Sequence, residues 1–205
     1  MVRAGVTVER VTLAAAELAD EVGFDKVTVA AVARRFGVRE ASLYSHIKNA
    51  HDLKTRVALL ALAELADDVA AAVAGRAGKD ALVAFASAYR SYAKRHPGRY
   101  TAARMELDPE TARKSAAVRH SEMTRAILRA YALPEPDQTD AVRMLGAVFH
   151  GYVSLETSGA FQHTPRDVEA SWAATLDALD SALRNWPTAS TTSTTSTAPR
   201  TPSAS

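Results

Sequence analysis

Apolar residues recur at steps of three and four along most of this chain, and that spacing places them on one face of an α-helix. The first such stretch holds Val8, Val11, Ala15 and Val22 and ends at Gly23, a residue type common just after a helix. Strict alternation of apolar and polar residues, which is typical of β-strands, is scarce. The pattern therefore predicts an all-α fold.

Capping residues, glycine and proline divide the rest of the pattern into further helices. Thr28 can cap a second helix that ends at Gly37, and a third helix covers about 39–45. Asn49 can cap a long fourth helix, which the glycines of 74–78 end. The remaining predicted helices span about 79–95, a short segment that ends near Leu107, then 108–131, 137–160 and 165–186.

Composition narrows the class of protein. Apolar residues make up 47% of the 205 residues, enough for a sizeable core, and alanine, the best helix former, is prominent. The absence of cysteine excludes disulfides and thiolate metal sites. The chain has no signal-peptide core near its N-terminus and no apolar run approaching the ~20 residues of a membrane span. We therefore expect a soluble, cytoplasmic protein with no membrane contact.

The net charge is only +2 at pH 7, so an argument for nucleic-acid binding must depend on local geometry. Between Arg76 and Arg129, however, lysine and arginine outnumber aspartate and glutamate twelve to five. Two interpretations stay open for this segment: a solvated basic surface, or a site for an anionic ligand or partner. Residues 187–205 are rich in threonine and serine, and we expect them to form a disordered tail.

Residues 28–45 hold two short helical patterns separated by a turn that contains Gly37, which is the helix-turn-helix arrangement. The second helix of such a unit enters the major groove of DNA with its N-terminal residues at the base edges. Small or polar side chains are needed there, because bulky apolar ones would keep the helix out of the groove. The predicted base contacts are Arg39, Glu40, Ala41 and Ser42.

Residues at both ends of this unit carry groups that donate hydrogen bonds to phosphate oxygens. The expected phosphate contacts come from the hydroxyls of Thr28 and Tyr44, the imidazole of His46 and the ammonium of Lys48. Two of them have structural alternatives. Tyr44 also suits a half-buried core position, and His46 also suits an ordinary surface position.

With these residues in place, the run "TVAAVARRFGVREASLYSHIKNAHDL" at 28–53 resembles the signature of the TetR family of bacterial transcriptional regulators. The preceding "AAELADEVGFDKVTV" is similar to that family as well. The matching positions are Thr28, Ala33, Gly37, Val38, Leu43, Tyr44, His46 and Leu53. A second resemblance links "FHGYVSLETSGAF" at 149–161 to the Trp-His-Gly stretch of one TetR C-terminal subfamily, with Phe149 in place of tryptophan.

The resemblance implies about nine helices in two domains. A helix-turn-helix DNA-binding domain covers residues 1–52, and a ligand-binding and dimerisation domain covers residues 53–186. It also implies a repressor that binds a palindromic operator as a homodimer and is released by a small-molecule inducer, with no cofactor or metal. Physical reasoning also favours a homodimer, because one reading unit contacts only one half-site of double-stranded DNA.

Two sets of residues in the second domain are candidates for these roles. The expected ligand pocket is lined by Phe85, Tyr89, Tyr100, Arg104, Met105, His120, Met123 and Phe149. The expected dimer interface, on the last two helices, holds Leu145, Val148, Tyr152, Leu155, Trp172, Leu176, Leu179 and Leu183. Most of these side chains suit the core of a single chain equally well, and both interpretations stay open.

Two positions depart from the family pattern. Ala50 stands where the family usually has a lysine that reaches a phosphate, and Arg39 stands where it often has a serine or threonine that caps the recognition helix. Arg39 cannot cap, but its guanidinium can bind O6 and N7 of guanine. These departures affect the strength and the sequence of the operator, and leave the expected fold unchanged.

Three other functions are compatible with parts of the sequence. An enzyme needs a nucleophile–base pair or a metal cluster, and none of the six histidines stands in such a motif. A helical binding module with a vestigial reading unit is the second alternative, because Ala50 and the modest charge weaken the case for DNA contact. A transcriptional activator is the third. A purified protein that binds DNA and turns over no substrate would separate a regulator from an enzyme.

Overall fold

The structure is a computed structural model that describes residues 6–187, and all regular secondary structure in that range is helical. The nine α-helices are α1 (Val8–Val22), α2 (Val29–Phe36), α3 (Ala50–Val73), α4 (Gly78–Arg95), α5 (Pro97–Ala102), α6 (Pro109–Lys114), α7 (Ala117–Leu128), α8 (Asp137–Thr157) and α9 (Val168–Arg184). Three short 3₁₀ helices join them: η1 (Phe24–Lys26), η2 (Glu40–Ser45) and η3 (Arg129–Tyr131). The predicted all-α fold is confirmed.

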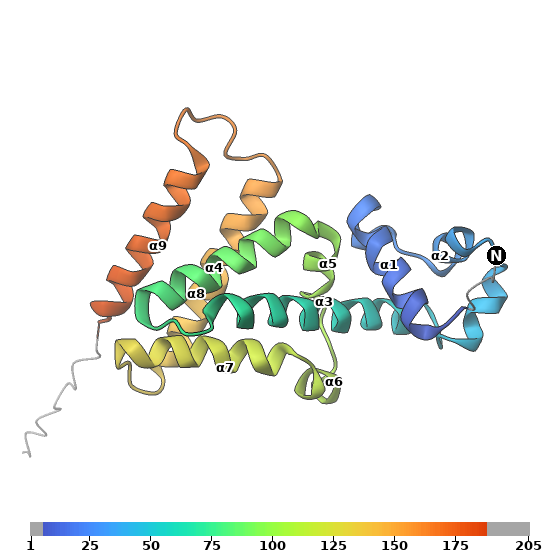
Figure 1. Ribbon diagram of the computed structural model, residues 1–205, viewed down its shortest axis with the longest axis horizontal. Coiled ribbons are helices and arrows are strands. Elements are labelled where there is room, and N and C mark those ends of the chain that lie inside the picture. Colours follow the sequence, from blue (N-terminus) through green and yellow to red (C-terminus); the bar gives the residue numbers. More distant parts are fainter. Residues whose placement is uncertain (1–5, 188–205) are drawn as a thin grey trace, which may run out of the picture.

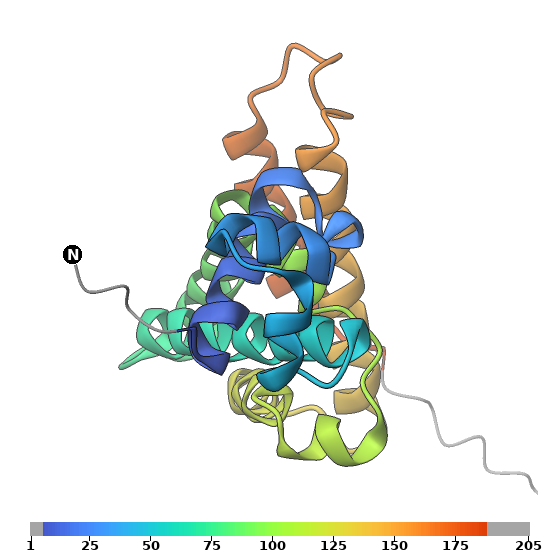
Figure 2. The same cartoon turned by 90° about the vertical axis from the view of Figure 1, so that its right-hand side faces the viewer.

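Figure 1 shows two parts joined by the long helix α3. The smaller part, which we call the head, contains α1, η1, α2, η2 and the start of α3. The larger part, the body, contains α4 to α9 packed around the rest of α3. Viewed from the head end, α1, α2 and the first turns of α3 stand in front of the body (Figure 2). Because α3 belongs to both parts, a tilt of α3 relative to the body moves the head.

Capping threonines begin the two helices that precede η2. Thr7 Oγ1 accepts a hydrogen bond from the N–H of Arg10, and Thr28 Oγ1 accepts one from the N–H of Ala31. Buried side chains between α1, α2, η2 and α3 form the core of the head; they include Val11, Ala15, Val32, Leu43, Ile47, Leu53 and Val57. Because Leu43 is fully buried, this core fixes one side of η2 and leaves its opposite side outside.

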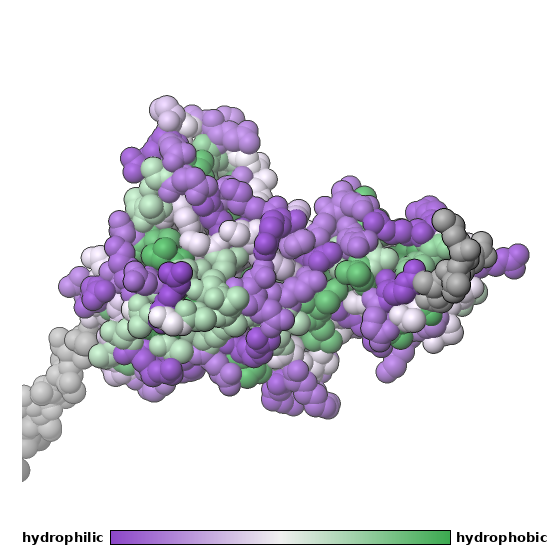
Figure 3. Space-filling model, viewed as in Figure 1, coloured by the Kyte–Doolittle hydropathy of each residue, from purple (hydrophilic) through white to green (hydrophobic). Residues whose placement is uncertain are grey.

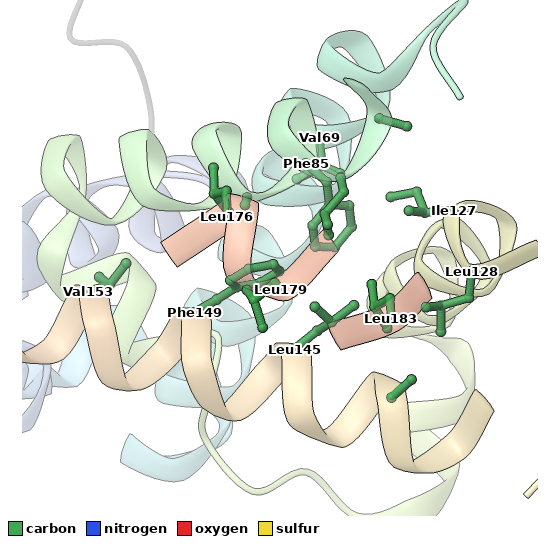
Figure 4. Close-up of a cluster of buried hydrophobic side chains, with 14 of the residues drawn as sticks. Val69, Phe85, Ile127, Leu128, Leu145, Phe149, Val153, Leu176, Leu179 and Leu183 are labelled. Carbon is green, nitrogen blue, oxygen red and sulfur yellow. The ribbon is translucent and has the colours of Figure 1, made fainter. Parts of the chain in front are cut away.

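Side chains from five helices, α3, α4, α7, α8 and α9, fill the core of the body (Figure 4). The ring of Phe149 lies among them, with its centroid 6.1 Å from that of Phe85 and 6.1 Å from that of Trp172. Other members are Leu65, Val69, Leu82, Ile127, Leu128, Leu145, Val153, Leu176, Leu179 and Leu183. Each such side chain contributes ~1.5–3 kcal/mol on burial, so this core joins α8 and α9 to α4.

Most basic residues between α4 and α7 pair with carboxylates, many of them on other helices. Arg90 of α4 is almost fully buried and bonds Glu156 of α8 and Glu169 of α9, each at 2.6 Å. Arg99 of α5 pairs with Asp20 of α1 at 3.0 Å. The excess of basic residues therefore serves largely to join helices, and Arg104 is an exception treated below.

Hydrophilic residues cover most of the face shown in Figure 3, with apolar patches on the body and beside the head.

Two predicted elements differ from the structure. The segment 39–45, predicted as a short helix, is helical but forms the 3₁₀ helix η2, which begins without a side-chain cap. The segment 108–131 was expected as one helix and is divided into α6 and α7 at Ser115. The Ser115 hydroxyl donates to the carbonyl of Ala112 at 2.8 Å and accepts from the N–H of Ala117 at 3.2 Å, and this pattern ends one helix and begins the next.

Three further expectations concern membrane spans, metal sites and the C-terminal tail. Among residues 6–187, no helix has both the length and the apolar character that a bilayer crossing requires. The same residues bring together no group of three or more His, Cys, Asp or Glu side chains suited to a metal ion. Of the tail predicted at 187–205, residues 188–205 lie outside the part of the chain that the structure describes.

Candidate nucleic-acid interface and ligand cavities

The turn before η2 has the backbone geometry of a helix end that redirects the chain. Gly37 ends α2 with a φ of +64°, in the left-handed region where a side chain is strained. The N–H groups of Gly37 and Val38 donate to the carbonyls of Arg34 and Ala33, each at 3.1 Å. These two bonds close the Schellman arrangement that ends many helices. The glycine that the motif predicted is thus required by the backbone conformation.

The start of η2 presents its polar side to solvent. Arg39, Glu40, Ala41 and Ser42 are all exposed, whereas Leu43 is fully buried in the head core. All four residues predicted to contact bases are therefore accessible to solvent. The buried side chain of Leu43 anchors this segment to the head core.

Two hydroxyl groups flank this surface. The side chain of Tyr44 is 49% exposed, so it does not occupy the half-buried core position that was its alternative. Its hydroxyl donates to Glu40 Oε1 at 3.2 Å, and this bond raises the pKa of Tyr44. Thr28 Oγ1 is also exposed and accepts from Ala31, which leaves its own proton free to donate.

The connection from η2 to α3 is fixed by one asparagine and one aspartate. Asn49 Oδ1 accepts from the N–H of Asp52 at 2.8 Å, and Asp52 Oδ2 accepts from the N–H of Lys48 at 2.9 Å. These bonds hold the backbone at Lys48 while its side chain stays exposed. His46 is half-buried, and Ala50 is exposed at the first position of α3.

A cavity of about 260 Å³ lies in the body between α3, α4, α7 and α8, and we call it the core cavity. Four residues of the predicted pocket line it: Phe85, Tyr89, His120 and Phe149. Its other lining residues are Leu62, Leu65, Ala117, Ser121, Thr124, Val142, Leu145 and Gly146. None of these described residues is an aspartate, glutamate, lysine or arginine, so the core cavity suits an uncharged and largely apolar molecule.

Among the described residues that line the core cavity, the titratable side chains are those of His120 and Tyr89. Its Nε2 lies 3.3 Å from the carbonyl oxygen of Leu62, and because a carbonyl can only accept, Nε2 carries the proton. Burial lowers the pKa of His120, so the ring is neutral at pH 7. Its Nδ1 is buried without a hydrogen-bond partner among the described residues.

A second cavity, of about 590 Å³, lies where the head meets the body, and we call it the junction cavity. Three other residues of the predicted pocket line it: Tyr100, Arg104 and Met105. The predicted pocket is therefore divided between two cavities. Tyr89 lies between them, because its ring centroid is 5.6 Å from that of Tyr100 and 6.4 Å from that of His120. Met123 lines neither cavity and borders a separate hollow beside the turn between α3 and α4.

The sequence matches two family profiles. Residues 11–50 match the family described as bacterial regulatory proteins, tetR family, and residues 82–179 match that described as tetracyclin repressor-like, C-terminal domain. The uncharacterised HTH-type transcriptional regulator Rv0681 of Mycobacterium tuberculosis is 34% identical over 150 residues, which cover 72% of this chain and 69% of that protein. The chain belongs to the TetR family. It is therefore a DNA-binding transcriptional regulator and not an enzyme, as its motifs predicted.

Further similar proteins agree with membership of the TetR family. YobS, an HTH-type transcriptional regulator of Bacillus subtilis, is 30% identical over 160 residues, covering 78% of this chain and 84% of YobS. The TetR family regulator PfmR of Thermus thermophilus superposes with a TM-score of 0.63 at 25% identity, over 85% of this chain and 96% of PfmR. A TetR variant of Acinetobacter baumannii in complex with minocycline gives a TM-score of 0.65 at 21% identity, over 88% and 98% of the two chains.

The side chains predicted for the TetR dimer interface divide into a buried and a more accessible group. Five of them are buried within one chain: Leu145, Trp172, Leu176, Leu179 and Leu183. Helix α8 packs against α4 and α7, and helix α9 packs against α4, so these buried side chains have little surface to offer a partner on the outside. Leu155 is 49% exposed, while Val148 and Tyr152 are half-buried. For the five buried side chains the structure favours the alternative, a role in the core of a single chain.

Two series of residues line the core cavity, and the sequence predicted only His120 and Phe149 among them as pocket residues, while Leu145 was predicted for the dimer interface. From α7 come Ala117, His120, Ser121 and Thr124, and from α8 come Val142, Leu145, Gly146 and Phe149. Each series follows the spacing i, i+3, i+4, i+7, which marks one helix face and is visible in the sequence. The spacing does not say that these two faces meet each other, and only the packing of the helices shows it.

Proposed function

We propose that this TetR-family protein is a repressor that binds a palindromic operator as a homodimer and leaves the operator when a small molecule enters the core cavity. The observation that carries the proposal is the tip of the head, where exposed polar residues at the start of η2 are held by the buried Leu43. A repressor of this kind acts in the cytoplasm, where bacterial DNA is found.

Each exposed residue has a chemical role in the proposed complex. Base edges are contacted by Arg39, Glu40, Ala41 and Ser42, and phosphates by Thr28, Tyr44, His46 and Lys48. The guanidinium of Arg39 matches O6 and N7 of guanine in a bidentate way. The Tyr44 hydroxyl exchanges Glu40 for a phosphate oxygen, because its one proton cannot serve both acceptors.

The proposed homodimer uses the outer faces of α8 and α9. Exposed residues there include Leu155 of α8 and four alanines of α9: Ala170, Ala173, Ala174 and Ala178. Alanines allow the helices of two copies to approach closely, and Leu155 supplies an apolar contact. The dimer then presents two heads about 34 Å apart, one turn of DNA, or a multiple of that distance.

The core cavity is the proposed inducer site. Leu62 and Leu65 belong to its wall and also to α3, which carries the head at its other end. A ligand that fits best when α3 is tilted favours a spacing of the heads that no longer matches the operator. The similar TetR variant that is complexed with minocycline supports binding of a small molecule by this fold.

Selection of bound fragments from the genomic DNA of the source organism tests the proposal. We expect the full chain to be a dimer by light scattering and to enrich fragments that share an inverted repeat. The matched control replaces both Arg39 and Lys48 by alanine; because both residues are exposed, this variant should fold normally and enrich nothing. A monomeric protein, or one that enriches no common sequence, contradicts the proposal.

A separate variant tests the inducer site. Ala117→Phe places an aromatic ring in the core cavity of about 260 Å³, so that the cavity no longer has room for a ligand. This variant should bind the selected operator as the natural protein does and should no longer release it with any compound that releases the natural protein. Release that is equal in both proteins would remove the core cavity from the proposal.

A further inference from the structure

The junction cavity has walls from both parts of the molecule. Phe24 and Asp25 of η1 form its head side, while Tyr100, Arg104 and His150 belong to its body side. In Figure 1, α5 lies between α1 of the head and the helices of the body. Pro97, Tyr100 and Thr101 of α5 line the cavity. A molecule bound there would touch the head and the body at the same time.

Arg104 differs from most arginines of this region, because its side-chain partners are the hydroxyls of Tyr89 and Tyr100 and not a carboxylate. Arg90, Arg95, Arg99 and Arg119 each pair with at least one carboxylate. Within residues 6–187, no carboxylate forms such a pair with Arg104, which is exposed on the cavity wall. Its five N–H donors are arranged in a planar fork that matches a carboxylate. The body side of the junction cavity therefore holds a positive charge without its own counter-charge.

Tyr100 and His150 add a hydrogen-bond donor next to this charge. The Tyr100 hydroxyl and His150 Nδ1 lie 3.0 Å apart. Burial raises the pKa of Tyr100, while burial and the nearby charge of Arg104 lower the pKa of His150, so both groups are neutral at pH 7. A neutral tyrosine and a neutral histidine have two such protons between them. Their mutual bond uses one. The other is on the Tyr100 hydroxyl or on His150 Nε2, depending on the tautomer, and on Tyr100 a bound anion would accept it in competition with the hydroxyl of Tyr89.

The remaining lining limits which anion fits. Phe24, Ala93 and Met105 give apolar surface that suits a hydrocarbon group. Asp25 stands on the head side with a negative charge, and it disfavours molecules that carry several negative charges. The cavity volume of about 590 Å³ is within the range of small-molecule sites. These features together select an apolar molecule with a single negative charge.

We propose that the junction cavity binds a small monocarboxylic acid, whose carboxylate pairs with Arg104 and accepts a hydrogen bond from the Tyr100–His150 pair. This site is distinct from the core cavity, which has no cationic side chain among its described lining residues. A bound acid bridges η1 and α8, so it fixes the angle between the head and the body. This second step rests on the proposed DNA-binding function, whereas the binding of the acid does not.

Calorimetric titration of the full chain without DNA tests the site, with sodium benzoate and sodium octanoate as probes. We expect saturable binding of at least one acid. The matching uncharged amide, benzamide or octanamide, should bind more weakly by roughly tenfold or more. Arg104→Gln should weaken binding of the acid by a similar factor. Acid and amide bound equally well, or no saturable binding of either acid, would overturn the proposal.

Three further variants identify which cavity is occupied. Ser154→Trp, which fills the junction cavity from α8, should abolish binding, and so it repeats the test without altering a charge. Arg113→Gln removes the same charge from an exposed position on α6, outside the cavity, and should leave binding unchanged. Ala117→Phe fills only the core cavity and should also leave binding unchanged. Loss of binding in Ala117→Phe with retention in Ser154→Trp would assign the acid to the core cavity and overturn the proposal.

The regulatory step has its own measurement. With the selected operator in hand, the acid that binds should change the operator affinity of the natural protein by roughly fivefold or more. The affinity of Arg104→Gln should not respond at the same concentration. If the acid binds and the operator affinity stays unchanged, the regulatory step is wrong, whereas a protein that binds no DNA at all would overturn the proposed function and leave the acid site standing.

Discussion

Gly98 of α5 lies directly against the backbone of Ala19 in α1, so closely that a methyl group on Gly98 would overlap the Ala19 carbonyl. The neighbouring Asp20 strengthens this contact. Its carboxylate accepts from the N–H of Arg99 at 2.9 Å, pairs with the Arg99 guanidinium at 3.0 Å, and lies 3.1 Å from His96 Nδ1. The head is thus fastened to the body through α5, in addition to its covalent connection through α3.

Replacement of Gly98 by alanine should therefore destabilise the protein. The added methyl group must push α5 away from the backbone of α1, and overpacking of this kind typically costs ~1–3 kcal/mol. Urea unfolding followed by circular dichroism measures the change in the free energy of unfolding. Gly146→Ala on α8 is the matched control, because nothing lies within 4 Å of a Cβ built there. That control should gain ~0.5–1 kcal/mol from lower chain entropy, and equal stabilities of the two variants would contradict the contact.

The head could be predicted from the sequence because its signals are local. Thr28, Gly37 and Asn49 each act on backbone groups within a few residues, and the structure has Thr28 and Asn49 as caps and Gly37 as a left-handed helix end. The same holds for Leu43, whose apolar character alone predicts the buried side of η2. The local pattern predicts a helix at 39–45 but does not specify its 3₁₀ conformation, which a segment of six residues adopts without a side-chain cap at its start.

The body could be predicted only as a set of helices. Tyr89 and Tyr100 were expected in one pocket with His120, and only the packing of α4 against α5 and α7 divides them between two cavities. The close contact of Gly98 with Ala19 depends on residues far apart in the chain, so no local pattern indicates it. Which apolar stripe of α8 and α9 faces inward depends on the same long-range packing.

The stability of the body should depend on pH through Glu156. Its carboxylate accepts two hydrogen bonds of 2.6 Å from Arg90 and one of 3.1 Å from Lys94. The bonds from Arg90, opposed by burial, hold the pKa of Glu156 below its ordinary value. The folded-state pKa is thus lower than the unfolded value of ~4.3, so this stabilisation is complete above about pH 4.3 and is lost as the pH falls through the lowered pKa.

We expect Glu156→Gln to lose ~1.5–3 kcal/mol of stability at neutral pH, the usual contribution of hydrogen bonds to a charged group. The difference from the natural protein should shrink as the pH falls below about 4.3, because the natural carboxylate then becomes protonated as well. Urea unfolding between about pH 7 and about pH 3 measures both effects. Glu110→Gln, which removes an exposed pair with Lys114, serves as the control and should change little. A difference that stays constant with pH would show that the charge of Glu156 is not responsible.

Arg39 should read one base pair of the operator. Removing its guanidinium in Arg39→Ala should cost ~1–3 kcal/mol on the selected operator and relax the preference at a single position. Fluorescence anisotropy with operator variants at constant salt measures this. An equal loss on the operator and on random DNA would mean that Arg39 contacts phosphate and reads no base.

Tyr44 should contribute to every DNA complex, whatever its sequence. In Tyr44→Phe the ring remains, and only the hydroxyl that now bonds Glu40 is lost. Affinity should fall by the same factor for the operator and for random DNA, because a phosphate contact carries no sequence information. A loss confined to the operator would place the Tyr44 hydroxyl at a base edge instead.

Lys48 and Ala50 provide opposite tests of the phosphate contacts beside α3. Both residues are exposed, and two hydrogen bonds hold the backbone around them: Asn49 Oδ1 accepts from the N–H of Asp52, and Asp52 Oδ2 accepts from the N–H of Lys48. Each lysine that reaches a phosphate releases one condensed counterion, so the slope of log affinity against log salt changes by about one unit per contact. Lys48→Ala should make the slope shallower by that amount. Ala50→Lys restores the lysine usual in the TetR family. It should make the slope steeper by the same amount and strengthen binding at low salt. It should also lower the stability slightly, because a cation at a helix N-terminus opposes the helix dipole. A slope that neither substitution changes would show that the start of α3 lies away from the DNA backbone.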